Sequence, residues 1–226
     1  MGATARTAWY HVLVKTREEL LNVYDAAGNI IGAQPRNVAK ASGRAVGAVN
    51  LLVVNAGGRI LLQRRPQDRE NGGLWDKSVG GHVSAGEDFD ATVVREAGEE
   101  LFDDPGSPRV RLLASESAFD EAVASCDLAE RVILRRVAWQ RNLRDVRHTP
   151  GGGLRNVLYH VAIYRGRTDL PLAGFRPQVS EIAELRYAPA AEVDRWLLEG
   201  RLAPNMAYLW LTQAHAILAE ASRPGC

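Results

Sequence analysis

The sequence predicts an α/β fold in which strands and hairpins surround one acidic helix and further helices close the chain. Three observations carry this prediction: apolar runs flank turn sequences at two places before residue 65, a helical pattern lies at about 89–101, and two more helical patterns end the chain. The 226 residues, of which 46% are hydrophobic, carry a net charge of +1. Such a chain is long enough for one well-buried domain with an extension.

Two antiparallel hairpins are predicted before residue 65. Apolar residues at 21–24 and 30–31 flank a first turn, and apolar runs at 49–54 and 60–63 flank a second. The near-continuous apolar run of the second hairpin is typical of a strand that is buried on both faces. We therefore expect the second hairpin in the core sheet.

The domain organisation follows from this pattern. We interpret residues 1–44 as an N-terminal extension that contains the first hairpin, and residues 45–226 as the main domain with an Arg-rich insertion at about 107–155. The apolar patch at 9–14 is broken by His11 and lacks a cleavage-site pattern, and no apolar run approaches membrane-spanning length. We therefore expect a cytoplasmic protein without a membrane partner.

An acidic helix is predicted at about 89–101. Asp88 is a good N-cap, and Val94, Ala97 and Leu101 recur at helical spacing. We therefore expect these apolar residues to face the core.

Three glutamates of this helix, Glu96, Glu99 and Glu100, fall within an arc of roughly 100° on the side away from the apolar residues. Like charges this close repel, so a partly enclosed cluster calls for a counter-cation or a raised pKa. Oxygen ligands favour Mg²⁺ or Mn²⁺ over zinc. The alternative is a solvated acidic face, and it is the preferred interpretation of the three acids when they are considered alone.

The second half of the chain is expected to contain one long hairpin. Residues 131–144 fit a helix or a strand, but the turn signal at 149–153 and the strand pattern at 156–164 favour the hairpin. A short strand is expected at 184–188.

Two helices are predicted to close the chain. Residues 191–198 are amphipathic and stop at Gly200. Pro204 suits the first turn of a final helix that runs to about residue 221.

The glycines before the acidic helix decide against the solvated face. Gly80, Gly81 and Gly86 let the backbone turn sharply and bring its carbonyls close to a ligand. This stretch and the helix together resemble the signature of the Nudix hydrolases. The positions in register are Gly81, Glu87, Arg95, Glu96, Ala97, Glu99 and Glu100.

The end of the signature is not matched. Phe102 stands where the family has a glycine, and Asp103 stands where it has an aliphatic residue. That glycine serves as a left-handed helix cap, a conformation costly for Phe, so we expect the helix to end differently, near residues 104–106. Phe102 is not among the metal-facing acids, so we expect the chemistry to survive.

The resemblance implies an α/β/α sandwich with a mixed central sheet, and an enzyme that cleaves a phosphoanhydride bond in a small-molecule diphosphate. Glu96, Glu99 and Glu100, with the carbonyl of Gly80, would hold Mg²⁺ or Mn²⁺. Glu87 would form an ion pair with Arg95 that supports the helix and the loop. Each of these roles is what the resemblance implies for the matching position.

The general base is left open by the resemblance. It would be one of the helix glutamates, Glu99 or Glu100, or an acid from a later loop. Glu181 is the candidate there, with Glu116 and Glu121 behind it, although each of these three fits an ordinary surface glutamate as well.

Two other functions stay open. The run from Gly73 to Val83 resembles the branch of the family that contains isopentenyl-diphosphate isomerases, but Gly80 stands where those enzymes have their active cysteine and Gly43 where they have a metal-binding histidine. Without that thiol the isomerisation lacks its acid/base group. A non-catalytic sensor for a nucleotide-like ligand is the other alternative, and the retained helix glutamates speak against it.

Substrate recognition is predicted from position and residue type. Arg64, Arg65 and Lys77 lie where they could meet phosphates, and Trp75 or Trp139 could stack on a base or ring, with core packing as the alternative for each tryptophan.

The Arg-rich stretch at 131–167 holds nine arginines and one acid, Asp145. A polyphosphate, coenzyme A or RNA partner could use such a patch, and a solvated face or a contact in a homodimer is the alternative. Few aromatic residues are interleaved with the arginines, so we do not expect a nucleic-acid partner.

Overall fold

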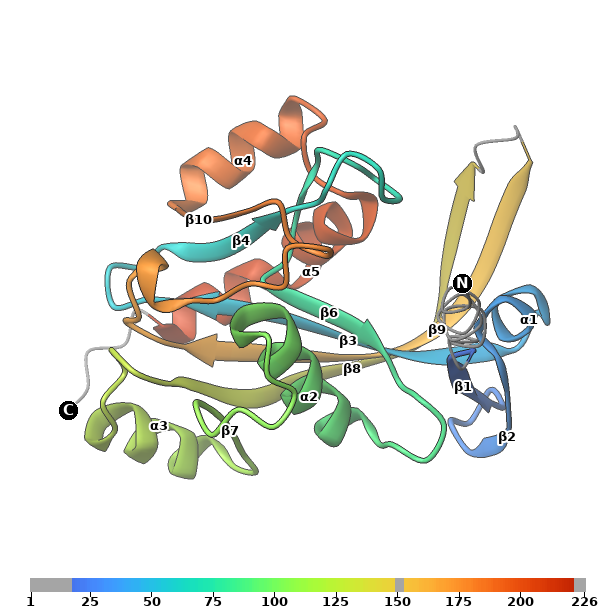
Figure 1. Ribbon diagram of the computed structural model, residues 1–226, viewed down its shortest axis with the longest axis horizontal. Helices are drawn as coiled ribbons and strands as arrows, with labels where there is room; N and C mark the ends of the chain where they lie inside the picture. The colour runs from blue at the N-terminus through green and yellow to red at the C-terminus, as the bar shows by residue number, and fades with distance from the viewer. Residues whose placement is uncertain (1–17, 149–152, 222–226) are drawn as a thin grey trace, which may run out of the picture.

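Figure 1 shows the computed structural model, which describes residues 18–148 and 153–221. The apolar patch at 9–14 and most of the turn predicted at 149–153 lie outside the described residues. In chain order the elements are β1 (Leu20–Tyr24), β2 (Ile30–Pro35), α1 (Arg36–Ala41), β3 (Ala45–Val54), β4 (Ile60–Arg64), β5 (Trp75–Asp76), β6 (Val79–His82), α2 (Phe89–Phe102), β7 (Val110–Leu113), α3 (Glu116–Ser125), β8 (Val132–His148), β9 (Leu154–Arg167), η1 (Leu172–Gly174), β10 (Glu184–Ala188), α4 (Ala190–Leu198) and α5 (Pro204–Ala221).

The strands form one mixed sheet. Its path runs β10-β4-β3-β9-β8-β7, while β1 and β6 also pair with β3, β2 pairs with β1, and β5 pairs with β4. The β3–β9 and β7–β8 pairs are parallel, and the other pairs are antiparallel. Strand β3 is therefore the centre of the sheet, which agrees with its predicted burial.

Helices cover both faces of this sheet (Figure 1). Because successive side chains of a strand point to opposite faces, β3 contributes to two apolar clusters. Leu51 belongs to the cluster that contains Ala97 of α2. Leu52 belongs to the cluster that contains Trp196 of α4 and Met206 of α5. The result is an α/β/α sandwich with a mixed sheet, as the sequence predicts.

Most of the predicted elements are present with nearly the predicted bounds. The two N-terminal hairpins are β1–β2 and β3–β4, the long hairpin is β8–β9, and the last strand and two helices are β10, α4 and α5. Elements α1, β5, β6, β7, α3 and η1 were not predicted. Figure 1 shows that the far part of the β8–β9 hairpin extends past α1 and leaves the body of the sheet.

Helix α2 begins as predicted and ends differently. The side chain of Asp88 accepts a hydrogen bond from the backbone N–H of Ala91 at 2.7 Å. The helix ends at Phe102, and Asp103 takes the left-handed conformation with φ 53°. The predicted end at 104–106 was therefore wrong, because the left-handed residue is the one after Phe102 and the helix needs no extra turn.

Phe102 itself is a core residue. Its ring stacks on Phe175 with 5.8 Å between centroids, and the guanidinium of Arg109 lies over it at 5.2 Å. Burial of the aromatic ring stabilises the helix end at the position where the signature has glycine.

Among the described residues, no helix is both long enough and apolar enough to cross a membrane.

Candidate active site

The candidate site lies where α2 crosses the glycine strand β6. Strand β6 pairs with β3, so its backbone is held in the sheet despite the low strand propensity of glycine. A Cβ at Gly81 would overlap the carboxylate of Glu96, and a Cβ at Gly80 would overlap Cε of Lys77. Both glycines therefore allow a close approach, and they form a cradle for two charged side chains.

Glu100 is buried between α2 and the sheet, with 8% of its surface exposed. It accepts a hydrogen bond from Nε2 of Gln63, a buried residue of β4, at 3.0 Å. Burial raises the pKa of Glu100, and the neighbouring Glu96 raises it further, against the opposing effects of Lys77 and Gln63. A nearby cation would therefore stabilise the ionised form of Glu100.

Glu96 is the second buried carboxylate, with 14% of its side chain exposed. Burial raises the pKa of Glu96 to about 7, although Arg95 opposes the shift through an ion pair of 3.0 Å between Nη2 and Oε1. Glu99 adds to the shift by repulsion. Two adjacent acids, Glu96 and Glu100, thus hold their protons more tightly than free glutamates do.

Arg95 links the helix to the loop before it. Its Nε and Nη2 atoms donate to the two carboxylate oxygens of Glu87 at 2.8 and 3.0 Å. Thr92 also donates to Glu87, at 2.9 Å. Burial tends to raise the pKa of Glu87, but the hydrogen bonds from Arg95 and Thr92 lower it overall. The predicted ion pair is present, in the two-pronged form that fixes orientation best.

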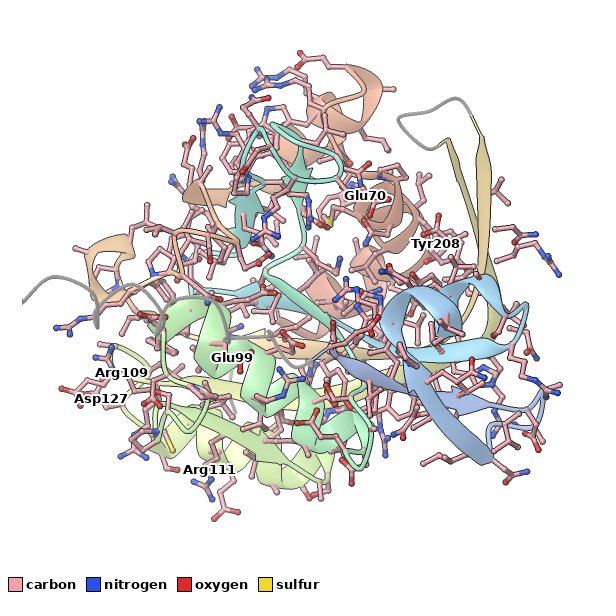
Figure 2. All side chains as sticks on the ribbon, turned by 45° about the vertical axis from the view of Figure 1, so that its right-hand side comes forward. Glu70, Glu99, Arg109, Arg111, Asp127 and Tyr208 are labelled. Carbon is pink, nitrogen blue, oxygen red and sulfur yellow. The ribbon has the colours of Figure 1, made fainter. Side chains whose placement is uncertain are left out.

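Glu99 does not join the two buried acids. Its Oε2 atom accepts from Nη1 of Arg95 at 2.9 Å, and Figure 2 labels it on α2. In the part of the chain that the structure describes, no group of three or more His, Cys, Asp or Glu side chains is arranged to hold a metal ion. Glu100 is instead buried against Gln63 of β4, so the three glutamates have different partners although they lie on one side of the helix.

A second charged group lies beside the two acids. Asp76 of β5 is 2% exposed and faces Gln63 across the β4–β5 pair. It accepts from Nζ of Lys77 at 3.1 Å and from Nη1 of Arg65 at 3.3 Å. Burial raises the pKa of Asp76, but Lys77 and Arg65 outweigh it and lower the pKa overall.

The sequence analysis assigned no role to Gln63 or Asp76. A signal was present for Gln63, because it follows Leu61 by two residues and so lies on the same face of a buried strand. A polar side chain at such a position needs a partner, and the partner is Glu100.

Several predicted substrate residues are engaged with other side chains of the protein. Trp75 is buried in the core, where it stacks on Trp196 with 4.7 Å between centroids, so it is not available to stack on a ligand. Trp139 packs edge-on against Phe89 at 4.4 Å. Arg64 forms an ion pair with Glu184 at 3.0 Å.

Two of the three later acids predicted as a general base form ion pairs with arginines. Glu181 forms an ion pair with Arg69 at 2.9 Å on the surface. Glu116 and Glu121 belong to α3, and Glu116 pairs with Arg135 at 3.1 Å. The loop before Glu181 does reach α2, because the N–H of Gln178 donates to the carbonyl of Glu100 at 3.3 Å.

The residues of the site fit a divalent cation in part. Glu96 and Glu100 are oxygen donors of the type that Mg²⁺ and Mn²⁺ prefer, and both are short of positive charge. The two glycines of β6 let the side chains of Lys77 and Glu96 approach the strand backbone closely. Glu99 would complete the set only by leaving Arg95.

The chain is similar to several known proteins. A family model described as the NUDIX domain matches residues 44–209. Over 86 residues, 37% of this chain, the chain is 40% identical to an uncharacterized Nudix hydrolase, orf19, of Rhodococcus erythropolis. Over 85 residues it is 33% identical to an isopentenyl-diphosphate Δ-isomerase of Serratia proteamaculans. The matches span 46% and 48% of these relatives, about half of their length.

A solved structure has the same fold. The protein DR0079 from Deinococcus radiodurans aligns with a TM-score of 0.54 over 91% of this chain and 100% of its own. The sequence identity is 19%, so the likeness concerns the fold alone.

Proposed function

The chain belongs to the Nudix family, and from this premise we propose that it is a Mg²⁺-dependent hydrolase that cleaves a phosphoanhydride linkage in a nucleoside-diphosphate-like or other organic diphosphate. The observation that carries the proposal is the pair of buried carboxylates, Glu96 and Glu100, on a helix that an Arg95–Glu87 ion pair fixes against a glycine strand.

Each side chain has a stated task in this proposal. Glu96 and Glu100, with the carbonyl of Gly80, would hold Mg²⁺ or Mn²⁺. When bound, the cation would neutralise phosphate oxygens and lower the pKa of the attacking water. Glu99 would leave Arg95 to join the ligands or to accept the proton of the water. Glu87 would keep Arg95, and with it α2, in place.

We propose fewer substrate-binding residues than the sequence alone suggests. Arg65 is partly exposed and is anchored by Asp76 and by the carbonyl of Glu70, so it presents a fixed positive charge beside the buried acids. Arg64 could reach a phosphate after leaving Glu184. We further propose a small-molecule substrate, a cytoplasmic location and no nucleic-acid partner.

Because one of the relatives is an isopentenyl-diphosphate Δ-isomerase, double-bond isomerisation is the second candidate function. In the described residues, the free cysteine is Cys126, at the end of α3 and not on β6 or α2. The thiol chemistry of an isomerase therefore has no counterpart at Gly80. A non-catalytic sensor is the third candidate.

One screen separates the three. Nucleoside-diphosphate sugars, dinucleoside polyphosphates, coenzyme A, thiamine diphosphate and isopentenyl diphosphate are incubated with the protein and Mg²⁺. Phosphate-containing cleavage products that disappear in a Glu100→Gln variant and persist in a Glu130→Gln control, at an exposed turn residue, support the hydrolase. Tight binding without turnover supports the sensor, and a dimethylallyl product supports the isomerase. Either of these last two results refutes the proposed hydrolase.

A further inference from the structure

Asn50 is a polar residue in the middle of the central strand β3. All residues of this strand are buried except Ala48 and Asn50, which are partly exposed. In the parallel register Asn50 lies next to Ile163 of β9, which is 1% exposed. Asparagine is depleted in strands, and a polar side chain among apolar neighbours normally has a hydrogen-bond partner.

The side chain of Asn50 has no such partner in the protein. Among the residues that the structure describes, none forms a hydrogen bond or an ion pair with it. By contrast, the amide of Asn22 in β1 donates to the carbonyls of Ser84 and Glu87 at 3.1 and 2.9 Å. The donor and acceptor groups of the Asn50 amide are therefore left for a molecule outside the fold.

The neighbours of Asn50 on the adjacent strand are small or flat. Asn50 pairs with Gly80 of β6, and Ala48 pairs with His82. Paired side chains share a face of the sheet, and all four residues are partly exposed, so we call them the Asn50 patch. The ring of His82 lies 5.9 Å from that of Tyr159 at the border of this patch.

The Asn50 patch is one strand away from the carboxylates of the candidate site. Gly81 follows Gly80 and faces α2, where a Cβ on it would overlap the carboxylate of Glu96. Glu96 and Asn50 therefore lie on opposite faces of β6. Among the described strands, β6 pairs only with β3, so no strand covers its second edge. A ligand at that edge would reach Glu96 with one part and Asn50 with another.

We propose that Asn50 is a specificity-determining residue that hydrogen-bonds the edge of a nucleobase, so that the substrate is a nucleoside diphosphate derivative. The inference rests on the proposed function, which supplies the site for the diphosphate. An asparagine amide places a donor and an acceptor side by side, which matches the paired groups on a base edge. An isoprenoid diphosphate offers no such groups.

The test is calorimetric titration in Mg²⁺ with ligands that resist hydrolysis. The ligands are the α,β-methylene diphosphates of adenosine, guanosine, cytidine and uridine, and methylenediphosphonate without a nucleoside. The wild type should bind at least one nucleoside analogue about tenfold or more tightly than methylenediphosphonate. Asn50→Val should lose most of this preference and should bind methylenediphosphonate within about twofold of the wild type. Asn37→Val, at an exposed asparagine of α1, is the control and should keep the preference.

The outcomes separate the two proposals. If the wild type shows no preference, or if Asn50→Val retains it, the inference is overturned, while binding of methylenediphosphonate with Mg²⁺ still supports the proposed function. If the wild type binds none of these ligands, the proposed function fails and the inference fails with it.

Thermal unfolding without ligand distinguishes recognition from a structural role. Asn50→Val should unfold at the same or a higher temperature than the wild type, because valine favours strands and no hydrogen bond is lost. Asn22→Val should unfold at a lower temperature, because two carbonyls lose their donor. A clearly lower unfolding temperature of Asn50→Val would assign Asn50 to the fold and overturn the inference.

Discussion

The carboxylate of Glu96 occupies the space that a side chain at Gly81 would need, because a Cβ at Gly81 would overlap it. The obstacle is the far end of a flexible side chain and not the backbone. A substitution there can be accommodated by moving Glu96, so its effect on the site and its effect on the fold should separate.

Gly81→Ala is the first test of this relationship. We expect a loss of stability below about 1 kcal/mol, because Glu96 can turn aside, but a loss of Mn²⁺ affinity and of turnover of about tenfold or more. Urea unfolding and a Mn²⁺ titration measure the two effects. Gly57→Ala, in the β3–β4 turn, is the control. Unchanged metal binding by Gly81→Ala would show that Glu96 is not positioned by this glycine.

Gly98→Ala, in contrast to Gly81→Ala, should mainly lower the stability of the fold. Alanine favours a helix by about 1 kcal/mol over glycine, but a Cβ at this position would overlap the backbone carbonyl of Asp104, where the chain folds back over the helix end. Overpacking against backbone costs about 1–3 kcal/mol and should win. Urea unfolding should show a less stable protein, and a more stable one would contradict the described end of α2.

Asp103→Gly should stabilise the protein. Asp103 ends α2 in the left-handed conformation, which costs an ordinary residue roughly 1 kcal/mol and costs glycine little. We expect a gain of up to about 1 kcal/mol in the free energy of unfolding. The matched control is Asp104→Gly, which should give no such gain. A destabilised Asp103→Gly variant would mean that the aspartate side chain contributes a contact of its own.

Some elements of the fold can be predicted from the sequence and others cannot. The hairpins and the terminal helices follow from local signals, because their turns and their periodic apolar residues lie next to one another in the chain. Strand β6 was missed because its glycines have low strand propensity and its structure depends on pairing with β3, some thirty residues earlier along the chain.

The sequence predicts which acids belong to the site but not how their side chains are arranged. The spacing of Glu96, Glu99 and Glu100 places them near one another, but it does not tell which acid is buried. The burial of Glu100 depends on Gln63, and Glu99 turns to Arg95. Glu181 was favoured by its place in the chain, whereas in the fold its side chain pairs with Arg69.

The stability of the metal-free protein should depend on pH through Glu96. Its pKa is raised by burial to about 7 from an unfolded value of 4.5, so the folded state holds the proton more tightly. The stabilisation from this proton is complete below pH 4.5 and is lost as the pH rises through about 7, by at most roughly 3 kcal/mol. Urea unfolding in EDTA at pH 5 and pH 8 measures the loss.

Glu96→Gln should show a smaller loss than the wild type between these two pH values, because the amide that replaces the carboxyl group does not titrate. Mg²⁺ should restore stability to the wild type at pH 8, because the cation replaces the proton. Identical pH dependence in the wild type and Glu96→Gln would contradict the burial of this carboxylate.

The central claim is that Glu96 and Glu100 bind a divalent cation beside the glycine strand. The most direct measurement is an anomalous difference map from crystals soaked in Mn²⁺. We predict a peak coordinated by both carboxylates and by the carbonyl of Gly80, with Glu99 released from Arg95. A map without Mn²⁺ at these atoms, with Glu100 still bound to Gln63 and Glu99 to Arg95, would contradict the account.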